Sequence, residues 1–261
     1  MNVRKTVALC LATGVCLSVA AGCEIGKLNG EGVLYPMKTD NVINATPVGS
    51  ENGINFYLLN DGSYGARLAS GVKDKKITVP AEFEGISVTT ILKNFLGDNA
   101  SVEELVLSSG ITKIASEAFS GGENLTSITI PDTVKEIGAY AFSACKKLAT
   151  IALPETVTSI ERGVFLSCEG LTELIIPDTV EEIKSHAFSG CAALENLTLG
   201  ESVEMIDEYA FFHCEKLSSV TFKNVSGWTA DGLAVAEQLL GDVAEAASFL
   251  RGNVEWLKTT K

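Results

Sequence analysis

A period of 23 residues runs through the second half of the chain, and it constrains the fold more than any other feature. Three apolar positions recur once in every period. They are occupied by Phe119, Phe142, Phe165, Phe188 and Phe211, by Ile114, Ile137, Ile160, Ile183 and Ile206, and by Leu125, Leu148, Leu171, Leu194 and Leu217. A unit of this length cannot bury its own apolar side, so a core closes only when neighbouring units stack. The period therefore predicts a solenoid, which offers an extended surface rather than a deep pocket.

Each regular unit is expected to supply one strand. The units span 108–130, 131–153, 154–176, 177–199 and 200–222. In the second unit, Pro131 begins a loop, and the spacing of Leu148, Ile151 and Leu153 predicts a strand with these side chains buried. Because each unit returns the chain to the same place one step along, successive strands should lie parallel.

The residues before the regular units predict a β-rich cap. Two strand-like runs, at 54–59 and 64–68, flank the hairpin signal Asn60-Asp61-Gly62-Ser63. Further strands are expected at 76–80, 86–91 and 102–107. We assign 51–107 to an N-terminal cap with an irregular repeat, because terminal units of a solenoid shield the first regular unit from water.

After Phe222 the period ends, and residues 223–261 are expected to form a C-terminal cap. Helices are predicted over 232–240 and 242–250, with Asp242 as the N-cap and Gly252 as the stop. The apolar face of these helices comprises Leu239, Leu240, Val243, Ala246, Ala247 and Leu250. We expect Trp228 and Trp256 to pack in the core, with Trp256 and Leu257 folding back onto the cap.

The repeat pattern resembles the BspA-like class of leucine-rich repeats found in bacterial surface proteins. The motif that carries the resemblance is Pro131…Val134…Ile137…Ala141-Phe142…Cys145…Leu148…Ile151…Leu153, and it recurs four more times. The first unit departs from it at Ser108 and Gly122, and the last begins with Gly200. The resemblance implies an α/β fold leaning to all-β: a right-handed solenoid with a parallel sheet, an N-terminal β cap and a C-terminal helical cap. It also implies binding of proteins of a host or of neighbouring cells.

The first residues have the features of an export signal. Arg4 and Lys5 precede an apolar run over 6–20, which is too short for a membrane span. Ala20, Ala21 and Gly22 then lead into Cys23, an arrangement that resembles the lipobox of bacterial lipoproteins. The resemblance implies a signal peptide over 1–22 and a lipid-anchored Cys23, in a protein exposed on the cell envelope. An ordinary signal cut near Ala21 is the alternative. Residues 23–50 are glycine- and proline-containing and are expected to form a flexible tether.

Four cysteines follow the 23-residue period: Cys145, Cys168, Cys191 and Cys214. Their spacing is that of the repeat, and it lacks the close pairs of a structural zinc site. We interpret them as a column of buried thiols that act as small hydrophobic side chains. A disulfide between adjacent units remains the alternative.

The composition and motifs disfavour several classes of function. A net charge of −13 argues against nucleic acid binding. Phosphate-binding loops, H-E-x-x-H and G-x-S-x-G are missing from the sequence, so we expect no enzyme activity and no cofactor. His186 and His213 occupy different positions of their units and are expected to be exposed turn residues. The column Asp132, Glu155, Asp178 and Glu201 could suggest calcium, but a solvated loop edge explains it, and no metal site is predicted.

The outward side chains of the predicted strands form the candidate binding face. They are Glu104, Ser127, Thr129, Thr150, Ala152, Glu173, Ile175, Asn196, Thr198, Ser219 and Thr221. The face is rich in small hydroxyl side chains and lacks the Trp, Tyr and Arg anchors of tight interfaces. The leading hypothesis is a non-catalytic envelope lipoprotein that binds an unknown protein, with its membrane contact made through lipid on Cys23. A structural envelope lipoprotein without a specific ligand is the alternative.

Overall fold

The computed structural model describes residues 41–230, 233–235, 237–252 and 256–258 of the chain. The chain divides into two compact units, Met1–Met37 and Lys38–Lys261. The first unit, which contains the predicted signal peptide and Cys23, lies outside the described residues. All structural statements below concern the second unit.

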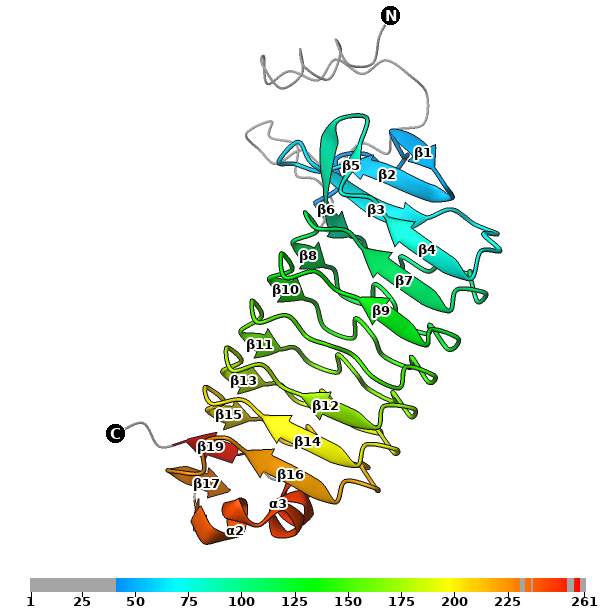
Figure 1. Cartoon of the computed structure of the whole chain (residues 1–261). Helices are drawn as coiled ribbons and strands as arrows, with labels where there is room; N and C mark the ends of the chain where they lie inside the picture. The colour runs from blue at the N-terminus through cyan, green and yellow to red at the C-terminus, as the bar shows by residue number, and fades with distance from the viewer. Residues whose placement is uncertain (1–40, 231–232, 236, 253–255, 259–261) are drawn as a thin grey trace, which may run out of the picture. The chain divides into compact units, whose positions relative to one another are not determined.

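A β cap begins the described chain. Strands β1 (Gly49–Glu51), β2 (Ile54–Leu58) and β3 (Tyr64–Leu68) form an antiparallel meander, in which β2 pairs with both neighbours. The predicted hairpin is confirmed: Asp61 Oδ1 accepts hydrogen bonds from the backbone N and the hydroxyl of Ser63, at 2.9 and 2.6 Å. These bonds lower the pKa of Asp61. β3 pairs in parallel with β6 (Ile86–Ile91), which itself pairs with the short β5 (Glu82–Phe83), so the cap is continuous with the stacked coils (Figure 1).

The strands predicted from the period form one side of the solenoid, which we call the long-strand side. Its members are β4 (Lys76–Val79), β7 (Glu104–Leu107), β9 (Ser127–Thr129), β12 (Glu173–Ile175), β14 (Asn196–Leu199) and β16 (Ser219–Phe222). Every pair is parallel, and from β7 onward the partners stand 23 residues apart, such as Glu104 with Ser127 and Asn196 with Ser219. The expected parallel arrangement is confirmed. We call each 23-residue turn a coil.

One predicted strand is wrong. Residues 149–153, in the coil whose pattern served as the type, adopt no strand, and the long-strand side therefore consists of two three-stranded sheets. Ala149 and Ala152 occupy positions that are Thr126 and Thr129 in the preceding coil. Alanine is depleted in strands because it offers little side chain to pack across a pleated surface. The strand was predicted from the spacing of the buried apolar residues, which says nothing about the strand propensity of the outward residues between them.

A second series of strands, which the sequence analysis missed, defines the short-strand side. Each coil contributes two residues here: β8 (Lys113–Ile114), β10 (Glu136–Ile137), β11 (Ser159–Ile160), β13 (Glu182–Ile183) and β15 (Met205–Ile206). Ile is buried in every pair, while its partner is exposed or half-buried. A two-residue strand is too short to show an alternating pattern, so periodicity could not indicate it.

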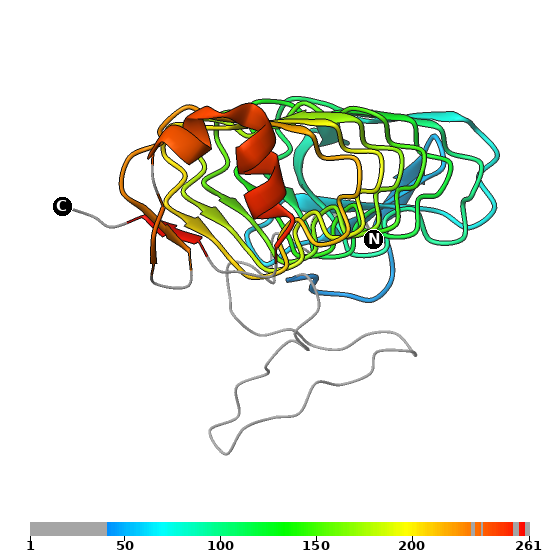
Figure 2. The same ribbon diagram turned by 90° about the horizontal axis from the view of Figure 1, so that it is seen from below.

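The core lies between these two sides, inside the coils that Figure 2 shows stacked one behind another. It consists of columns of identical side chains. The rings of Phe142, Phe165 and Phe188 are fully buried and nearly parallel, with centroids 5.4 Å apart. Offset stacking of this kind adds to the energy of burying the rings. The Ile and Leu columns of the repeat are buried as well. The solenoid predicted from the period, with neighbouring coils covering each other's apolar sides, is confirmed.

The C-terminal cap combines strands and two helices. β17 (Trp228–Ala230), β18 (Leu233–Ala234) and β19 (Trp256–Lys258) are antiparallel, and β19 also pairs with β15. The helices are α2 (Glu237–Gly241) and α3 (Val243–Leu250), so the helix expected from Gly232 begins later because Leu233–Ala234 pairs with β17 instead. Asp242 caps α3 as predicted, with Oδ1 accepting from the backbone N of Ala244 and Glu245.

The predicted burial in this cap is largely confirmed. Leu240, Ala246, Ala247 and Leu250 are buried, whereas Leu239 and Val243 are 37% and 44% exposed, contrary to the predicted apolar face. Both tryptophans are buried, and their rings pack edge to face at 6.4 Å. The cap thus covers the last coil, with α3 lying against β16.

Candidate interaction face

The outward side chains of the long-strand side lie in two columns, as the alternation of the strands requires. Nine of the eleven candidate residues are exposed, namely Glu104, Ser127, Thr129, Thr150, Ala152, Glu173, Ile175, Asn196 and Thr221, and Thr198 and Ser219 are half-buried. The alternate residues of each strand, such as Leu105 and Leu174, are buried. We call the eleven residues the candidate face.

The structure divides this face into two patches. Strand pairing places Glu104 beside Ser127 in one sheet, and Glu173 beside Asn196 and Ser219 in the other. Thr150 and Ala152 lie in the coil between the two sheets and belong to no strand. The candidate residues are therefore brought to one side of the solenoid, but they do not form one continuous sheet.

Ile175 is the prominent apolar residue of the face. It is 67% exposed, the highest value among the exposed large hydrophobic side chains in the described part of the chain. Strand register places it beside Thr198, and Thr198 beside Thr221. An exposed aliphatic side chain in the middle of a polar sheet contributes binding energy when a partner covers it.

The two acidic side chains of the face differ in their surroundings. Lys76 Nζ lies 3.1 Å from Glu104 Oε2, and Lys75 Nζ lies 2.8 Å from Glu103 Oε1, so the N-terminal patch is neutralised by its own lysines. Within residues 41–230 the structure records no ion pair for Glu173. Only the C-terminal patch therefore combines an uncompensated carboxylate with an exposed aliphatic side chain.

The two histidines occupy special backbone positions that sequence reasoning missed. Both have φ of +58°, in the left-handed region. His186 shares its position in the repeat with Glu117, Tyr140, Gly163 and Tyr209, and His213 shares its own with Gly121, Ala144, Ser167 and Gly190. The glycines in these two columns are the sequence feature that could have indicated a left-handed backbone, because glycine adopts this conformation without a steric penalty.

The surroundings of the histidines are aromatic. The ring of His186 stacks on that of Tyr209 at 5.3 Å and 9°, and the ring of His213 lies 3.9 Å from that of Phe212. Both lie in turns, as predicted, and His213 is exposed, but His186 is half-buried, contrary to the expected exposure. Neither belongs to a group of three potential metal ligands in the described residues.

The acidic column is part of a loop edge. Asp178 Oδ1 accepts a hydrogen bond of 2.6 Å from Lys223 Nζ and one of 3.1 Å from the backbone N of Glu201. The bond from Lys223 is the main reason that the pKa of Asp178 is lowered. This carboxylate therefore links its own coil to the next. Among the described residues, no group of three potential metal ligands includes it.

The four repeat cysteines are buried and free. Each Sγ lies 3.1–3.3 Å from the backbone carbonyl oxygen of a phenylalanine in the coil before, to which it donates. Burial raises the pKa of all four thiols, to about 12 for Cys145 and for Cys214. The interpretation as buried apolar side chains is confirmed, and the chemistry of a reactive thiolate is suppressed.

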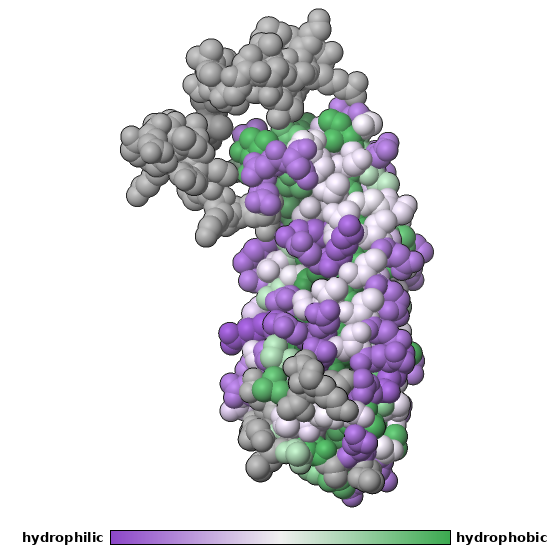
Figure 3. Space-filling model, turned by 90° about the vertical axis from the view of Figure 1, so that its left-hand side faces the viewer, coloured by the Kyte–Doolittle hydropathy of each residue, from purple (hydrophilic) through white to green (hydrophobic). Residues whose placement is uncertain are grey.

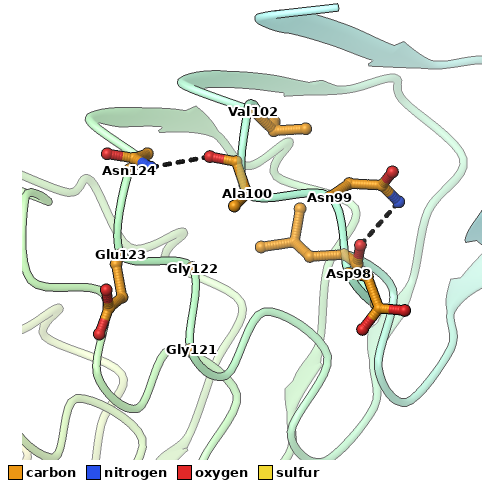
Figure 4. Close-up of a pocket in the computed structure, with 10 residues that line it drawn as sticks. Asp98, Asn99, Ala100, Val102, Gly121, Gly122, Glu123 and Asn124 are labelled. Atoms are coloured by element: carbon orange, nitrogen blue, oxygen red, sulfur yellow. Dashed lines mark hydrogen bonds between the residues drawn. The ribbon is translucent and has the colours of Figure 1, made fainter. Parts of the chain in front are cut away.

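A hollow lies at the turns of two adjacent coils, lined by residues 96–100, 102 and 121–124 (Figure 4). Its amide side chains bind backbone: Asn124 Nδ2 donates to Ala100 O at 2.8 Å, and Asn99 Nδ2 donates to Leu96 O at 2.8 Å. Asn99 Oδ1 also accepts from the backbone N of Val72. The amide groups that line the hollow are thus engaged with backbone atoms, so we assign the hollow a structural role in joining the coils.

Among the described residues, no helix is long and apolar enough to cross a membrane. Cys23, the predicted lipidation site, lies outside the described residues.

Comparisons with known proteins agree with this architecture. Residues 89–218 match the model of the BspA type leucine rich repeat region, in six copies. The match begins upstream of the first regular unit, where the same register already holds: Thr90 pairs with Lys113 and Ile91 with Ile114. A comparison with curated proteins found no match.

The similar solved structures include three bacterial leucine-rich repeat proteins. A leucine rich repeat protein of T. pallidum is 27% identical with a TM-score of 0.62, over 67% of this chain and 83% of that one. A leucine rich cell surface protein of Faecalibacterium prausnitzii is 25% identical with a TM-score of 0.52, over 67% of this chain and 39% of that one. A leucine-rich repeat protein of Eubacterium ventriosum, 22% identical with a TM-score of 0.56 over 66% and 47%, supports the fold alone. The chain thus spans less than half of the latter two proteins.

Proposed function

Because the chain belongs to the BspA-type leucine-rich repeat family, we propose that it is a non-catalytic interaction scaffold that binds a protein through its long-strand side. Leucine-rich repeat solenoids present long, regular surfaces, and their function depends on the side chains displayed there rather than on the fold.

The observation that carries this proposal is the exposure of Ile175 beside Glu173, a carboxylate for which residues 41–230 record no ion pair. Burying an exposed aliphatic side chain of this size contributes about 1.5–3 kcal/mol when a partner removes it from water. A carboxylate beside it favours partners that offer a positive charge at the rim of an apolar recess, and so adds specificity and speeds association. The C-terminal patch is therefore the proposed point of contact, and the neutralised N-terminal patch is a secondary surface.

We place this scaffold on the bacterial cell envelope. The F. prausnitzii relative is described as a cell surface protein. The lipobox-like residues before Cys23 support the same location, with acyl chains on that cysteine as the anchor. A partner would then be a protein of a host or of a neighbouring cell.

The experiment is a capture assay with the full chain and intact neighbouring or host cells as the source of partner. Glu173→Lys with Ile175→Glu should abolish retention of the partner and leave the urea midpoint unchanged, because both side chains are exposed. Glu204→Lys with Thr158→Glu is the matched control: it makes the same change in net charge at exposed positions of the short-strand side.

Retention by the control and loss by the face variant supports the proposal. Equal retention by both variants excludes the candidate face as the site. Failure of the unaltered chain to retain any protein favours the alternative function, an envelope protein without a specific ligand.

A further inference from the structure

Strand pairing fails twice at the same place along the solenoid. On the long-strand side, the sheet β4-β7-β9 ends before residues 149–153, and the sheet β12-β14-β16 begins after them. On the short-strand side, β8 pairs with β10 and β11 pairs with β13, but β10 and β11 belong to different sheets. Two separate ladders are therefore interrupted around one coil, at residues 131–153.

On the long-strand side the interruption follows from a missing hydroxyl. Thr126 donates to Glu103 O through both its backbone N, at 2.8 Å, and its Oγ1, at 2.9 Å. Thr172 makes the equivalent pair of bonds to Ala149 O, at 3.0 and 3.4 Å. Ala149 has no hydroxyl, and within residues 41–230 no hydrogen bond from its backbone N to Thr126 O is recorded. This loss lies between the coil 131–153 and the coil before it, whereas the Thr172 pair of bonds joins 131–153 to the coil after it.

On the short-strand side the interruption follows from a close approach. Gly138 N donates to Ile114 O at 2.8 Å, and Lys184 N donates to Ile160 O at 2.9 Å. Between these coils, no such bond from Glu161 to Ile137 is recorded in the described chain. A Cβ on Gly138 would lie 2.4 Å from Ser116 N, so only glycine permits this contact. On the short-strand side, the coil 131–153 is thus bonded to the coil before it, and the missing ladder lies between it and the coil after it.

Strand pairing is missing from both sides at the boundary between 131–153 and 154–176. On the strand sides, two bonds from Thr172 to Ala149 O remain, together with one from Thr156 Oγ1 to Val134 O. In the core and at the turns, the rings of Phe142 and Phe165 stack at 5.4 Å and 6°, and Phe142 N donates to Val164 O at 2.9 Å. These contacts hold the two coils together without the paired strands that join other coils.

We propose that the boundary between residues 131–153 and 154–176 is a seam at which the solenoid opens, so that the two blocks 41–153 and 154–258 unfold in separate steps. In a stack of repeats each unit contacts only its neighbours, so a weak interface divides the cooperative unit at that interface. This inference concerns the fold itself and does not depend on the proposed partner.

The block after the seam opens first. Residues 154–258 carry 18 Asp and Glu against six Lys and Arg, whereas residues 41–153 carry 12 against nine. Like charges held close together destabilise a compact state through self-repulsion. Figure 3 views the short-strand side, where hydrophilic side chains cover much of the surface.

The two tryptophans make this testable, because Trp228 and Trp256 are the only ones in the sequence and both belong to the second block. Urea unfolding of the full chain is followed in parallel by tryptophan fluorescence and by far-UV circular dichroism. The fluorescence midpoint should lie at least about 0.5 M urea below the dichroism midpoint, a difference that a two-state protein does not show. Coincident midpoints would overturn the proposal.

A variant tests the location of the seam. Thr172→Ala removes a hydroxyl bond that crosses the seam, to Ala149 O, and should widen the separation between the two midpoints. Thr126→Ala removes the equivalent bond to Glu103 O, which lies between two coils of the first block; it is the matched control and should not widen the separation. Equal behaviour of the two variants would contradict the seam at this boundary.

Hydrogen exchange gives an independent reading in low urea. Peptides from residues 154–250 should lose protection together while those from 54–148 retain it. Loss of protection that proceeds coil by coil from either end, with no step at Pro154, would also overturn the proposal.

Discussion

The thiol of Cys168 donates a hydrogen bond of 3.1 Å to the backbone carbonyl oxygen of Phe142, in the coil before. The relationship recurs in each of the four cysteine-containing coils. Cysteine is small and apolar enough for the core, and its thiol is a second, weak donor to a buried carbonyl oxygen that also accepts from the backbone N of Cys145 at 3.1 Å. The repeat therefore uses cysteine for packing and for joining coils.

The buried thiols make stability depend on pH. An unfolded cysteine ionises near pH 8.5, whereas burial raises the pKa of Cys214 to about 12 in the folded chain. As the pH rises between these values the unfolded state releases a proton that the folded state keeps. The free energy of unfolding therefore falls, by up to about 1.4 kcal/mol per pH unit for each thiol. Urea unfolding between about pH 8 and about pH 10 should show a shallower decline for Cys214→Ser than for the unaltered chain. Identical slopes would contradict this account.

Truncating the phenylalanine column should be costly. Phe165 is fully buried between Phe142 and Phe188, so Phe165→Ala removes two stacked contacts and leaves a cavity. We expect a loss of roughly 3–5 kcal/mol in the free energy of unfolding. Glu155→Ala, at an exposed loop position in the same coil, should change it by no more than about 0.5 kcal/mol. Comparable losses in the two variants would argue against a core made by stacked rings.

Two substitutions at the left-handed repeat position shared by Gly121 and Ala144 should change the stability of the chain in opposite directions. Ala144 has φ of +58°, so Ala144→Gly should stabilise the chain by relieving a backbone cost of about 1–2 kcal/mol, less the entropy that glycine loses on folding. Gly121 occupies the same position one coil earlier with φ of +75°, and a Cβ there meets no atom within 4 Å. Gly121→Ala should therefore destabilise by about 1 kcal/mol through the backbone alone. Thermal unfolding of both variants measures the two effects, and a shift of equal sign would count against them.

Particular residues show how far the sequence predicted this structure. The phenylalanine, isoleucine and cysteine columns located the core and the direction of stacking, because burial on one side of a repeat imposes a strict period. The strand predicted at 149–153 does not form, because Ala149 and Ala152 lack the hydroxyl and packing groups of the threonines in the coil before. The spacing of the apolar residues is the same in both coils, so the pattern could not indicate this difference. The left-handed positions of His186 and His213 were hidden because non-glycine residues occupy most of those columns.

The candidate face was predicted with the same mixture of success and failure. Alternation along the strands placed nine of its eleven residues at exposed positions. The pairing of Lys76 with Glu104, which distinguishes the two patches, involves residues 28 positions apart and outside the regular period, so no repeat pattern could indicate it.

Lipid anchoring of Cys23 remains a prediction from the sequence. Cys23→Ser should move the protein from the detergent phase to the aqueous phase of a detergent phase split, because the acyl chains would be lost. The Cys10→Ser variant, altered within the predicted signal peptide, is the control and should stay with the detergent. Partition of the Cys23→Ser protein with detergent would remove the anchor from the account.

The most direct test of the stacked architecture is circular dichroism of a synthetic peptide that contains residues 154–176 alone. One coil has no neighbour to cover its apolar side, so we expect no cooperative thermal transition, whereas each block of the full chain should melt cooperatively. A sharp melting transition in the isolated coil would contradict the claim that the core forms only between coils.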